Sequence, residues 1–269
     1  MIDLPVACSP CPNDLFILHA WVHGKLDSPY RPQIDIADVQ TLNEWAVDEK
    51  YPLIKVSYGV LSQLKRPENY LILPTGSALG WNSGPLLVAN RKIDREDVRH
   101  ARVAVPGANT TARWLFDFFI QPQQEPIWCS YEEVFPLLLA GEVDAGVLIH
   151  ETRFEYERYQ MQLVADLGAE WERRYELPIP LGGFLLHRSM CDQASALIAA
   201  LRSSLESAWK DRASTYPFLL SHSIEKDEVI IRRHLDLFVT QETHTFSATG
   251  RIAVAKLCEL MGVSVEVLE

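Results

Sequence analysis

The chain has 269 residues, of which 48% are hydrophobic, and a formal net charge of −11 at pH 7. Its length and composition allow a large core and suit one two-lobed unit or two modest domains. The negative charge and the lack of a basic run exclude a general nucleic-acid or anionic-membrane surface, so an anionic ligand would need a local site.

The five cysteines are odd in number and scattered, at positions 8, 11, 129, 191 and 258. Cys8 and Cys11 have the spacing of a redox or zinc motif, but no second Cys or His pair completes a metal site. We therefore expect reduced thiols and no bound metal. The N-terminus lacks a basic segment followed by an apolar one, and no apolar stretch approaches a membrane span. These features predict a cytoplasmic protein.

The first predicted unit is a strand over residues 5–8, a polar loop and a helix over residues 15–22. Pro12 suits the first turn of that helix, since a proline there loses no hydrogen bond. Asn13 and Asp14 either cap the helix or contact a ligand, and the sequence leaves both interpretations open.

The second predicted unit is a strand over residues 33–39, followed by a helix that Thr41 and Glu44 open as a capping box. Asn43 lies in the first turn of this helix. Its amide is expected to face either a ligand or solvent.

A third strand is predicted over residues 53–57, in an apolar run that Lys55 interrupts. The default for such a lysine is to extend its ammonium outwards into water. Ser57 stands at the carboxyl end of the strand, where ligands of α/β proteins bind. After a strand over residues 70–73, residues 75–85 carry three glycines. They either let the backbone approach a ligand or form a plain surface loop.

Residues 86–88 are then expected to form a strand that crosses between the lobes, after which the strand–loop–helix pattern restarts. A strand over residues 103–105 leads to Thr110 and Thr111 at the start of a helix. Free backbone N–H groups and two hydroxyls at this point would form an anion site. Simple N-capping by Asn109 or Thr110 is the alternative, but the repeated layout favours ligand binding.

A helix over residues 131–140, a tight turn and a buried strand over residues 145–149 lead directly to His150. An imidazole at the carboxyl end of such a strand is well suited to proton transfer near neutral pH. Most of the eight histidines, such as His100 and His222, are expected at the surface. The residue types alone leave a chemical and a structural role for His150 equally open.

The remaining elements complete a two-lobed α/β architecture around a cleft. A strand over residues 163–167 precedes a return to the first lobe at residues 177–184, and helices follow over residues 194–209, about 227–238 and 247–261. The predicted ranges are residues 1–92 for the first part of lobe one, 93–185 for lobe two, and 186–269 for a helical return to lobe one.

The inventory of motifs narrows the chemistry that such a cleft could support. The sequence has no acidic cluster, nucleotide fingerprint or motif-marked nucleophile triad. One well-placed histidine among neutral hydroxyl and amide groups fits proton abstraction without a cofactor, or simple ligand binding.

Several short motifs occur in one order: Ser9 to Asp14, Thr41 to Asn43, Lys55 to Tyr58, Gly76 to Gly80 with Gly84-Pro85, Pro106 to Thr111, and Ile149 to Glu151. With these motifs the chain resembles the 1,4-dihydroxy-6-naphthoate synthase family, which serves the futalosine route to menaquinone. The resemblance extends from Ser9 to Gly182 and weakens in the C-terminal helices. The first and last motifs are its most specific parts.

The resemblance implies a periplasmic-binding-protein-like fold of the second type, used as an enzyme. It implies a cofactor-independent carbon–carbon lyase that converts cyclic de-hypoxanthine futalosine into 1,4-dihydroxy-6-naphthoate and releases dihydroxyacetone. By the same resemblance, His150 is the proton acceptor. The segment Lys55-Val56-Ser57 and the pair Thr110 and Thr111 would hold the substrate.

On this hypothesis neutral His150 accepts a proton from the substrate, and the threonine pair at the helix N-terminus holds its carboxylate. The other predicted substrate contacts are Ser57, Asn43, Ser77 and Asn13. Lobe closure would exclude water. The expected partner is the small-molecule substrate, without nucleic acid or membrane, in a monomer or homodimer.

Other classes of protein remain open at this stage. A solute-binding protein that feeds a transporter would share the fold, although the missing export signal argues against it. A related dehydratase acting on chorismate would share the fold but lack the Ser-Pro-Cys-Pro-Asn-Asp opening. A ligand-sensing regulator is disfavoured, because no helix-turn-helix precedes Pro5.

Overall fold

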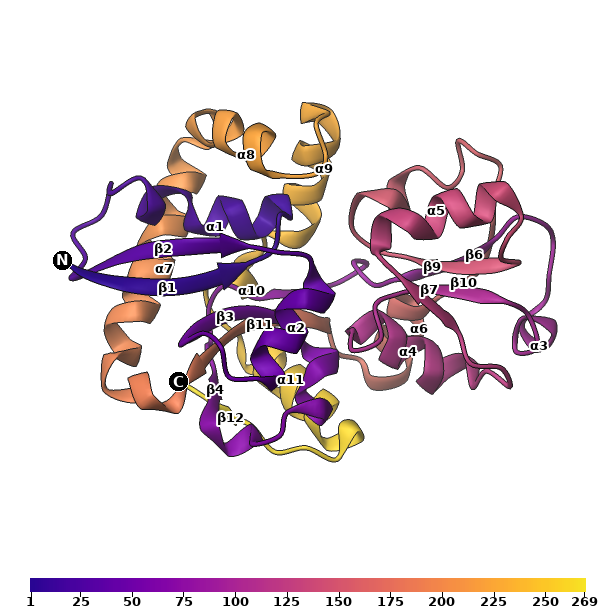
Figure 1. Ribbon diagram of the computed structural model, residues 1–269, viewed down its shortest axis with the longest axis horizontal. Helices are drawn as coiled ribbons and strands as arrows, with labels where there is room; N and C mark the ends of the chain where they lie inside the picture. Colours follow the sequence, from indigo (N-terminus) through magenta and orange to yellow (C-terminus); the bar gives the residue numbers. More distant parts are fainter.

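The computed structural model describes residues 1–269, which form two α/β lobes lying side by side (Figure 1). The strands of the first lobe are β1 (Ile2–Cys8), β2 (Tyr30–Ile36), β3 (Leu53–Ser57), β4 (Tyr70–Ile72), β5 (Ala78–Gly80), β11 (Ile179–His187) and β12 (Glu266–Val267). They form one sheet in the order β12-β4-β11-β3-β1-β2, with β5 also paired to β11.

The second lobe has its own sheet. Its strands are β6 (Leu86–Ala89), β7 (Val103–Pro106), β8 (Ile127–Cys129), β9 (Ala145–Leu148) and β10 (Gln162–Asp166). Their order is β10-β6-β9-β7-β8. The prediction of two α/β lobes is therefore confirmed.

Helices surround both sheets (Figure 1). The α-helices are α1 (Pro12–Val22), α2 (Val39–Val47), α3 (Arg95–Val98), α4 (Thr111–Ile120), α5 (Tyr131–Ala140), α6 (Leu167–Tyr175), α7 (Ala194–Lys210), α8 (Tyr216–His222), α9 (Glu228–Phe238), α10 (Gln241–His244) and α11 (Ala248–Met261). The 3-10 helices are η1 (Tyr58–Gln63), η2 (Pro67–Asn69), η3 (His150–Phe154), η4 (Arg188–Gln193) and η5 (Arg212–Thr215).

Strand β6 differs from its prediction. Residues 86–88 were expected to cross between the lobes, but β6 pairs with β9 and β10 inside the second sheet. All four of its residues are buried, which is typical of an apolar strand with both faces covered. The chain has thus already crossed before Leu86, within the range of residues 1–92 predicted for the first lobe.

The two faces of the first sheet are covered by different helices. Successive side chains of a strand point to opposite faces. Leu53 of β3 packs in a cluster with α1, α7, α8 and α9, whereas Ile54 and Val56 pack in a second cluster with α2 and α11. The alternation therefore places Lys55 on the face that α1 covers.

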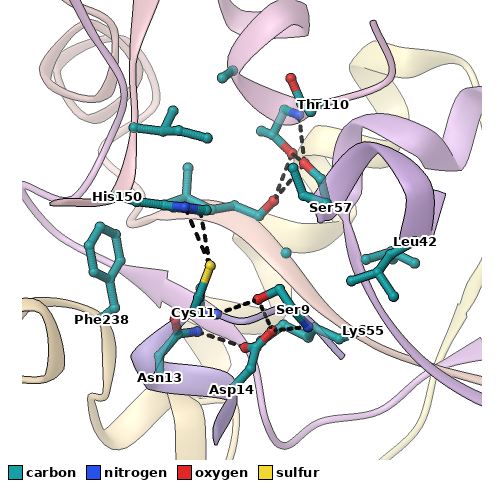
Figure 2. Close-up of a pocket in the computed structure, with 18 of the residues that line it drawn as sticks. Ser9, Cys11, Asn13, Asp14, Leu42, Lys55, Ser57, Thr110, His150 and Phe238 are labelled. Atoms are coloured by element: carbon teal, nitrogen blue, oxygen red, sulfur yellow. Dashed lines mark hydrogen bonds and ion pairs between the residues drawn. The ribbon is translucent and has the colours of Figure 1, made fainter. Parts of the chain in front are cut away.

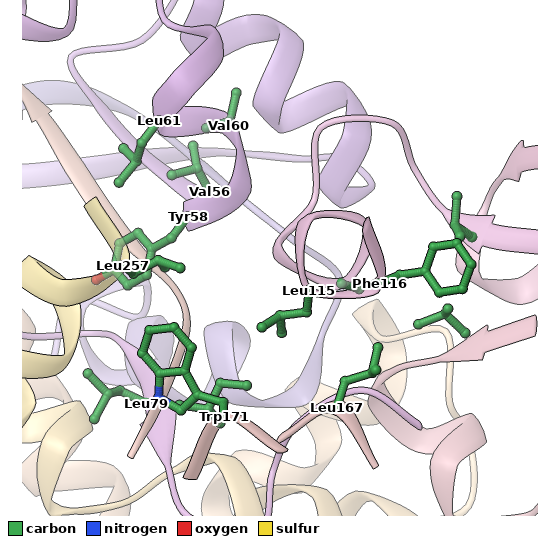
Figure 3. Close-up of a cluster of buried hydrophobic side chains, with 14 of the residues drawn as sticks. Val56, Tyr58, Val60, Leu61, Leu79, Leu115, Phe116, Leu167, Trp171 and Leu257 are labelled. Atoms are coloured by element: carbon green, nitrogen blue, oxygen red, sulfur yellow. The ribbon is translucent and has the colours of Figure 1, made fainter. Parts of the chain in front are cut away.

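The second of these clusters extends from one lobe into the other. Its 34 buried residues include Val56 and Tyr58 from the first lobe and Leu115 and Trp171 from α4 and α6 of the second (Figure 3). The backbones approach closely at Gly59, where an added Cβ would lie 2.2 Å from the carbonyl carbon of Thr110. The lobes consequently share a core.

Two local predictions in the first lobe are wrong. Helix α2 does not open with a capping box at Thr41 and Glu44; it begins at Val39, and the Asp38 carboxylate accepts hydrogen bonds from the N–H groups of Gln40 and Thr41. An aspartate at the N-cap is an equally strong start signal, and it stands three residues earlier. The preceding strand accordingly ends at Ile36 rather than at residue 39.

Residues 75–85 are not a plain surface loop. They contain β5, and most of them are buried. The close backbone approach at Gly84 is to Gly168 of α6 rather than to the floor of the pocket described below, because a Cβ on Gly84 would lie 2.2 Å from the Cα of Gly168.

All five cysteines are free thiols, as expected. No helix of the chain is both long enough and apolar enough to cross a membrane.

Candidate active site

A pocket of about 730 Å³, counting the space at its mouth, lies where the two lobes meet. Residues at or just beyond the carboxyl ends of β1, β3 and β9 line it, together with the first turn of α4. Convergence of strand ends at one cleft is the general ligand-binding arrangement of open α/β sheets.

The pocket gathers most of the residues predicted from the sequence. Seven of the nine line it: Asn13, Lys55, Val56, Ser57, Thr110, Thr111 and His150. Asn43 and Ser77 do not; both are fully buried beside it.

The floor of the pocket holds a buried ion pair (Figure 2). The Lys55 ammonium donates to Oδ1 of Asp14, and the two side chains are 6% and 3% exposed. The expectation that Lys55 extends into water is therefore wrong. Because Lys55 shares its face of the sheet with Leu53, its side chain runs under α1, where the Asp14 carboxylate accepts its hydrogen bond.

Asp14 also organises the loop that precedes α1. Its Oδ2 accepts from the Ser9 hydroxyl at 2.7 Å, and its Oδ1 accepts from the Asn13 amide at 2.8 Å. The N-cap of α1 is Cys11, with no side-chain cap hydrogen bond. The capping interpretation of Asn13 and Asp14 is therefore wrong, and both residues face the pocket.

His150 enters the pocket from the opposite lobe, two residues after β9 ends (Figure 2). Its backbone has φ +51°, a left-handed conformation that costs a non-glycine residue free energy and recurs at functional sites. The Cys11 sulfur lies 3.4 Å from Nδ1 and 3.7 Å from Nε2. The ring also packs edge-on against Tyr131, with centroids 4.8 Å apart.

Burial determines the protonation of these groups. It lowers the pKa of His150 to about 4, while Asp14 acts to raise it and Lys55 to lower it further. Burial also raises the pKa of the Cys11 thiol well above its usual range. At neutral pH, therefore, the pocket presents a neutral imidazole beside a neutral thiol.

The predicted anion site is largely occupied by contacts between the lobes (Figure 2). The Thr111 N–H donates to Ser57 Oγ at 2.7 Å, and the Thr111 hydroxyl donates to the Leu181 carbonyl at 2.7 Å. The Thr110 hydroxyl accepts from the Arg113 N–H, so N-capping does occur. Of the first-turn amides, that of Ala112 has no protein acceptor and lies in the pocket lining.

Asn43 is a further link between the lobes. Its amide donates to the Asn109 carbonyl at 2.8 Å and accepts from the Ser57 N–H at 3.1 Å. It faces neither solvent nor the pocket, and it holds Ser57 in place from behind.

Sequence reasoning missed two residues, Glu151 and His234. His234 of α9 lines the pocket and is 1% exposed. The signal was available, because Ile231, His234, Leu235 and Phe238 follow helical spacing on one face, which places a histidine on the buried side. Glu151 entered the sequence analysis only as the last residue of the Ile149 to Glu151 motif and was given no role, although it is 6% exposed.

Comparison with known proteins identifies the family of the chain. A family model described as menaquinone biosynthesis matches residues 4–262. A 1,4-dihydroxy-6-naphthoate synthase of Thermus thermophilus is 38% identical over 258 residues, covering 96% of this chain and 93% of the relative. A 1,4-dihydroxy-6-naphthoate synthase of Streptomyces coelicolor is 36% identical over 262 residues, covering 94% and 91%. The resemblance inferred from the motifs is confirmed.

Solved structures confirm the fold. A protein of Archaeoglobus fulgidus superposes with a TM-score of 0.89 at 29% identity, covering 97% of this chain and 98% of that one. The alkanesulfonate-binding protein SsuA of Xanthomonas axonopodis, bound to MOPS, gives a TM-score of 0.69 at 15% identity, covering 97% and 93%. The predicted periplasmic-binding-protein-like fold is therefore correct.

Proposed function

The chain belongs to the menaquinone biosynthesis family, and on that premise we propose that it is a carbon–carbon lyase that forms 1,4-dihydroxy-6-naphthoate. The proposed substrate is cyclic de-hypoxanthine futalosine, and the proposed second product is dihydroxyacetone. The observation that carries the proposal is one neutral histidine, His150, at a strand end in the pocket between the lobes.

His150 is the proposed proton acceptor. The Cys11 sulfur is nearly equidistant from the two ring nitrogens, so it does not lie along the in-plane lone pair of either one. The unprotonated nitrogen can therefore accept a proton from the substrate. The electron pair of the bond that held this proton forms a ring double bond, and the carbon–carbon bond to the three-carbon fragment breaks. The fragment leaves with the electron pair of that bond and takes up a proton there. Formation of an aromatic ring drives this sequence, so the protein needs to supply only a base, orientation and protection from water.

The segment from Lys55 to Ser57 and the first turn of α4 are the proposed substrate cradle. Since the hydroxyl of Thr111 and two amides of that turn already have partners, the Ala112 N–H is the backbone donor left for a carboxylate. The positive end of the α4 dipole favours an anion at the same place.

The test compares the purified chain with His150→Ala and His150→Asn in an assay that follows the naphthoate chromophore, without added metal or nucleotide. Asparagine tolerates the left-handed backbone at this position and cannot act as the base. We expect both variants to fold and to lose about 10²–10⁴-fold in rate. His100→Asn, away from the pocket, is the matched control and should keep the wild-type rate.

Two outcomes would contradict the proposal. Wild-type protein that binds the compound but never turns it over would behave as a binding protein, not a lyase. Turnover that survives in His150→Asn would leave the lyase activity in place and remove His150 as its base.

A further inference from the structure

Behind the pocket a carboxyl group meets an imidazole without any nearby cation partner. Glu151 lies on η3 and His234 on α9, and they are 6% and 1% exposed. Oε1 of Glu151 is 3.4 Å from Nδ1 of His234, and this nitrogen otherwise has no hydrogen-bond partner in the structure. A buried polar atom without a partner destabilises the fold, so the position of the proton between these two atoms has to be accounted for.

The other side of the imidazole fixes the tautomer. Nε2 of His234 is 2.9 Å from Oδ1 of Asn13, while the amide of Asn13 donates to Asp14. Since Oδ1 of Asn13 can only accept, Nε2 of His234 must carry the hydrogen. In a neutral ring Nδ1 then has no hydrogen and can only accept a hydrogen bond. A carboxylate has no hydrogen to donate to it, whereas a carboxylic acid does.

The surroundings favour the neutral pair. The titratable and charged groups that face it are Tyr131 and Glu132 of α5, Glu225 before α9, Cys11 at the start of α1, His150 of η3, and the Asp14–Lys55 pair beyond Asn13. The guanidinium of Arg233, also on α9, lies over the ring of Phe154. The pKa of Glu151 is raised to about 7, chiefly by burial; a hydrogen bond from its own backbone N–H acts to lower it, and Glu225 and Glu132 act to raise it. Burial lowers the pKa of His234.

We propose that Glu151 in its protonated form donates a hydrogen bond to Nδ1 of His234 and, through His234 and Asn13, positions the Asp14–Lys55 pair at the floor of the pocket. Glu151 is a positioning residue, because it does not line the pocket itself. We call this series of hydrogen bonds, from Glu151 through His234 and Asn13 to Asp14, the relay. Its kinetic consequences rest on the proposed lyase function, whereas the position of the proton on Glu151 does not.

The relay predicts a decline in rate on the alkaline side. When Glu151 loses its proton, a carboxylate faces a lone pair across 3.4 Å, and the His234 ring must turn or change tautomer. Either change removes the hydrogen bond to Asn13 and with it the orientation of the Asn13 amide toward Asp14. A displacement of about 1 Å at an active site can cost on the order of 100-fold in rate.

The kinetic experiment uses Glu151→Gln, Glu151→Leu and the control Glu132→Gln. Glutamine keeps a neutral donor at every pH, so the alkaline decline in the kcat–pH profile of Glu151→Gln should move up by at least about one pH unit or disappear. Leucine keeps no donor, so kcat should fall at least about tenfold while KM changes less than about threefold. Glu132→Gln removes an exposed carboxylate that acts to raise the pKa of Glu151, so the alkaline decline in rate should persist and shift slightly to lower pH, the opposite direction from Glu151→Gln.

Infrared spectroscopy of protein labelled with ¹³C at glutamate carboxyl groups reports the proton without any turnover. A protonated-carboxyl band should be present at pH 6, disappear as the pH rises to about 8, and be absent from Glu151→Gln. Absence of the band in wild-type protein at pH 6 would overturn the proposal, as would a glutamine variant that keeps the alkaline limb or loses as much kcat as the leucine variant. If the wild type shows the band but no turnover, the lyase proposal fails and the relay stands.

Discussion

Lys55 and Asp14 should be strongly coupled in their effect on the free energy of unfolding, and removing Asp14 should cost more than removing Lys55. Lys55→Met keeps the apolar stem and leaves the Asp14 carboxylate three donors: the Ser9 hydroxyl, the Ser9 N–H at 3.3 Å and the Asn13 amide. Asp14→Leu leaves a buried ammonium without its hydrogen-bond acceptor, with the ring of Phe184 5.4 Å from Nζ. Removing one partner of a buried pair costs about 3–5 kcal/mol when the other charge is stranded. We therefore expect about 4 kcal/mol for Asp14→Leu and about 2 kcal/mol for Lys55→Met.

The double variant should cost less than the sum of the two single variants by about 2 kcal/mol, because no charge is then left unpaired. Urea unfolding of the four proteins at pH 7, followed by circular dichroism, measures these differences, provided that the slopes of free energy against urea agree. Additivity within about 0.5 kcal/mol would refute the coupling. A Lys55→Met variant less stable than Asp14→Leu would refute the asymmetry, and with it the importance assigned to the Ser9 and Asn13 donors.

Two further predictions concern the shared core and the buried histidines. Gly59→Ala places a Cβ 2.2 Å from the Thr110 backbone, so it should lower the free energy of unfolding by about 3 kcal/mol and weaken substrate binding. Gly141→Ala, at φ +71° in open space, should lower it by only about 1 kcal/mol. Equal losses in urea unfolding would show that the lobes separate easily. Burial lowers the folded-state pKa of His19 to about 4, so its share of stability is present above the unfolded pKa near 6.5 and is lost as the pH falls from there through about 4. Thermal unfolding of His19→Leu between pH 7 and pH 4.5 should therefore show a smaller decrease in Tm than wild type, and an unchanged decrease would contradict this reasoning.

Helices with capping residues at both ends were predicted well from the sequence. Helix α5 spans residues 131–140 as expected, because Glu133 completes a capping box with Ser130 and Gly141 takes up the left-handed C-cap. Helix α11 likewise begins after Ser247 and ends before Gly262. The pocket was predictable for a related reason: the carboxyl ends of buried strands meet at one edge, whichever residues stand there.

The partners of the polar side chains were not predictable, because they come from distant parts of the chain. The alternation along β3 fixes the face on which Lys55 lies, but only the docking of α1 on that face brings Asp14 to it. The sequence is equally compatible with Asn43 as a ligand contact or as a solvated residue. Only the packing of the segment before α4 brings the Asn109 carbonyl to its amide. For His234 the helical spacing could have revealed its burial, but its contacts with Asn13 and Glu151 depend on how three separate segments pack.

The charges of the pocket are balanced before any substrate arrives. Lys55 and Asp14 neutralise each other, while burial keeps His150 uncharged above about pH 4 and keeps Glu151, just behind the pocket, mostly uncharged below about pH 7. In the proposed reaction the substrate carboxylate adds one negative charge to this balanced site. A negative charge near an imidazole raises its pKa. An imidazole with a pKa of about 4 is a weak base, so the bound substrate would itself bring His150 closer to the pKa at which a general base works best at neutral pH. Burial thus keeps the histidine unprotonated in the empty pocket, and in the proposed reaction the charge of the substrate would strengthen it as a base when the proton has to move.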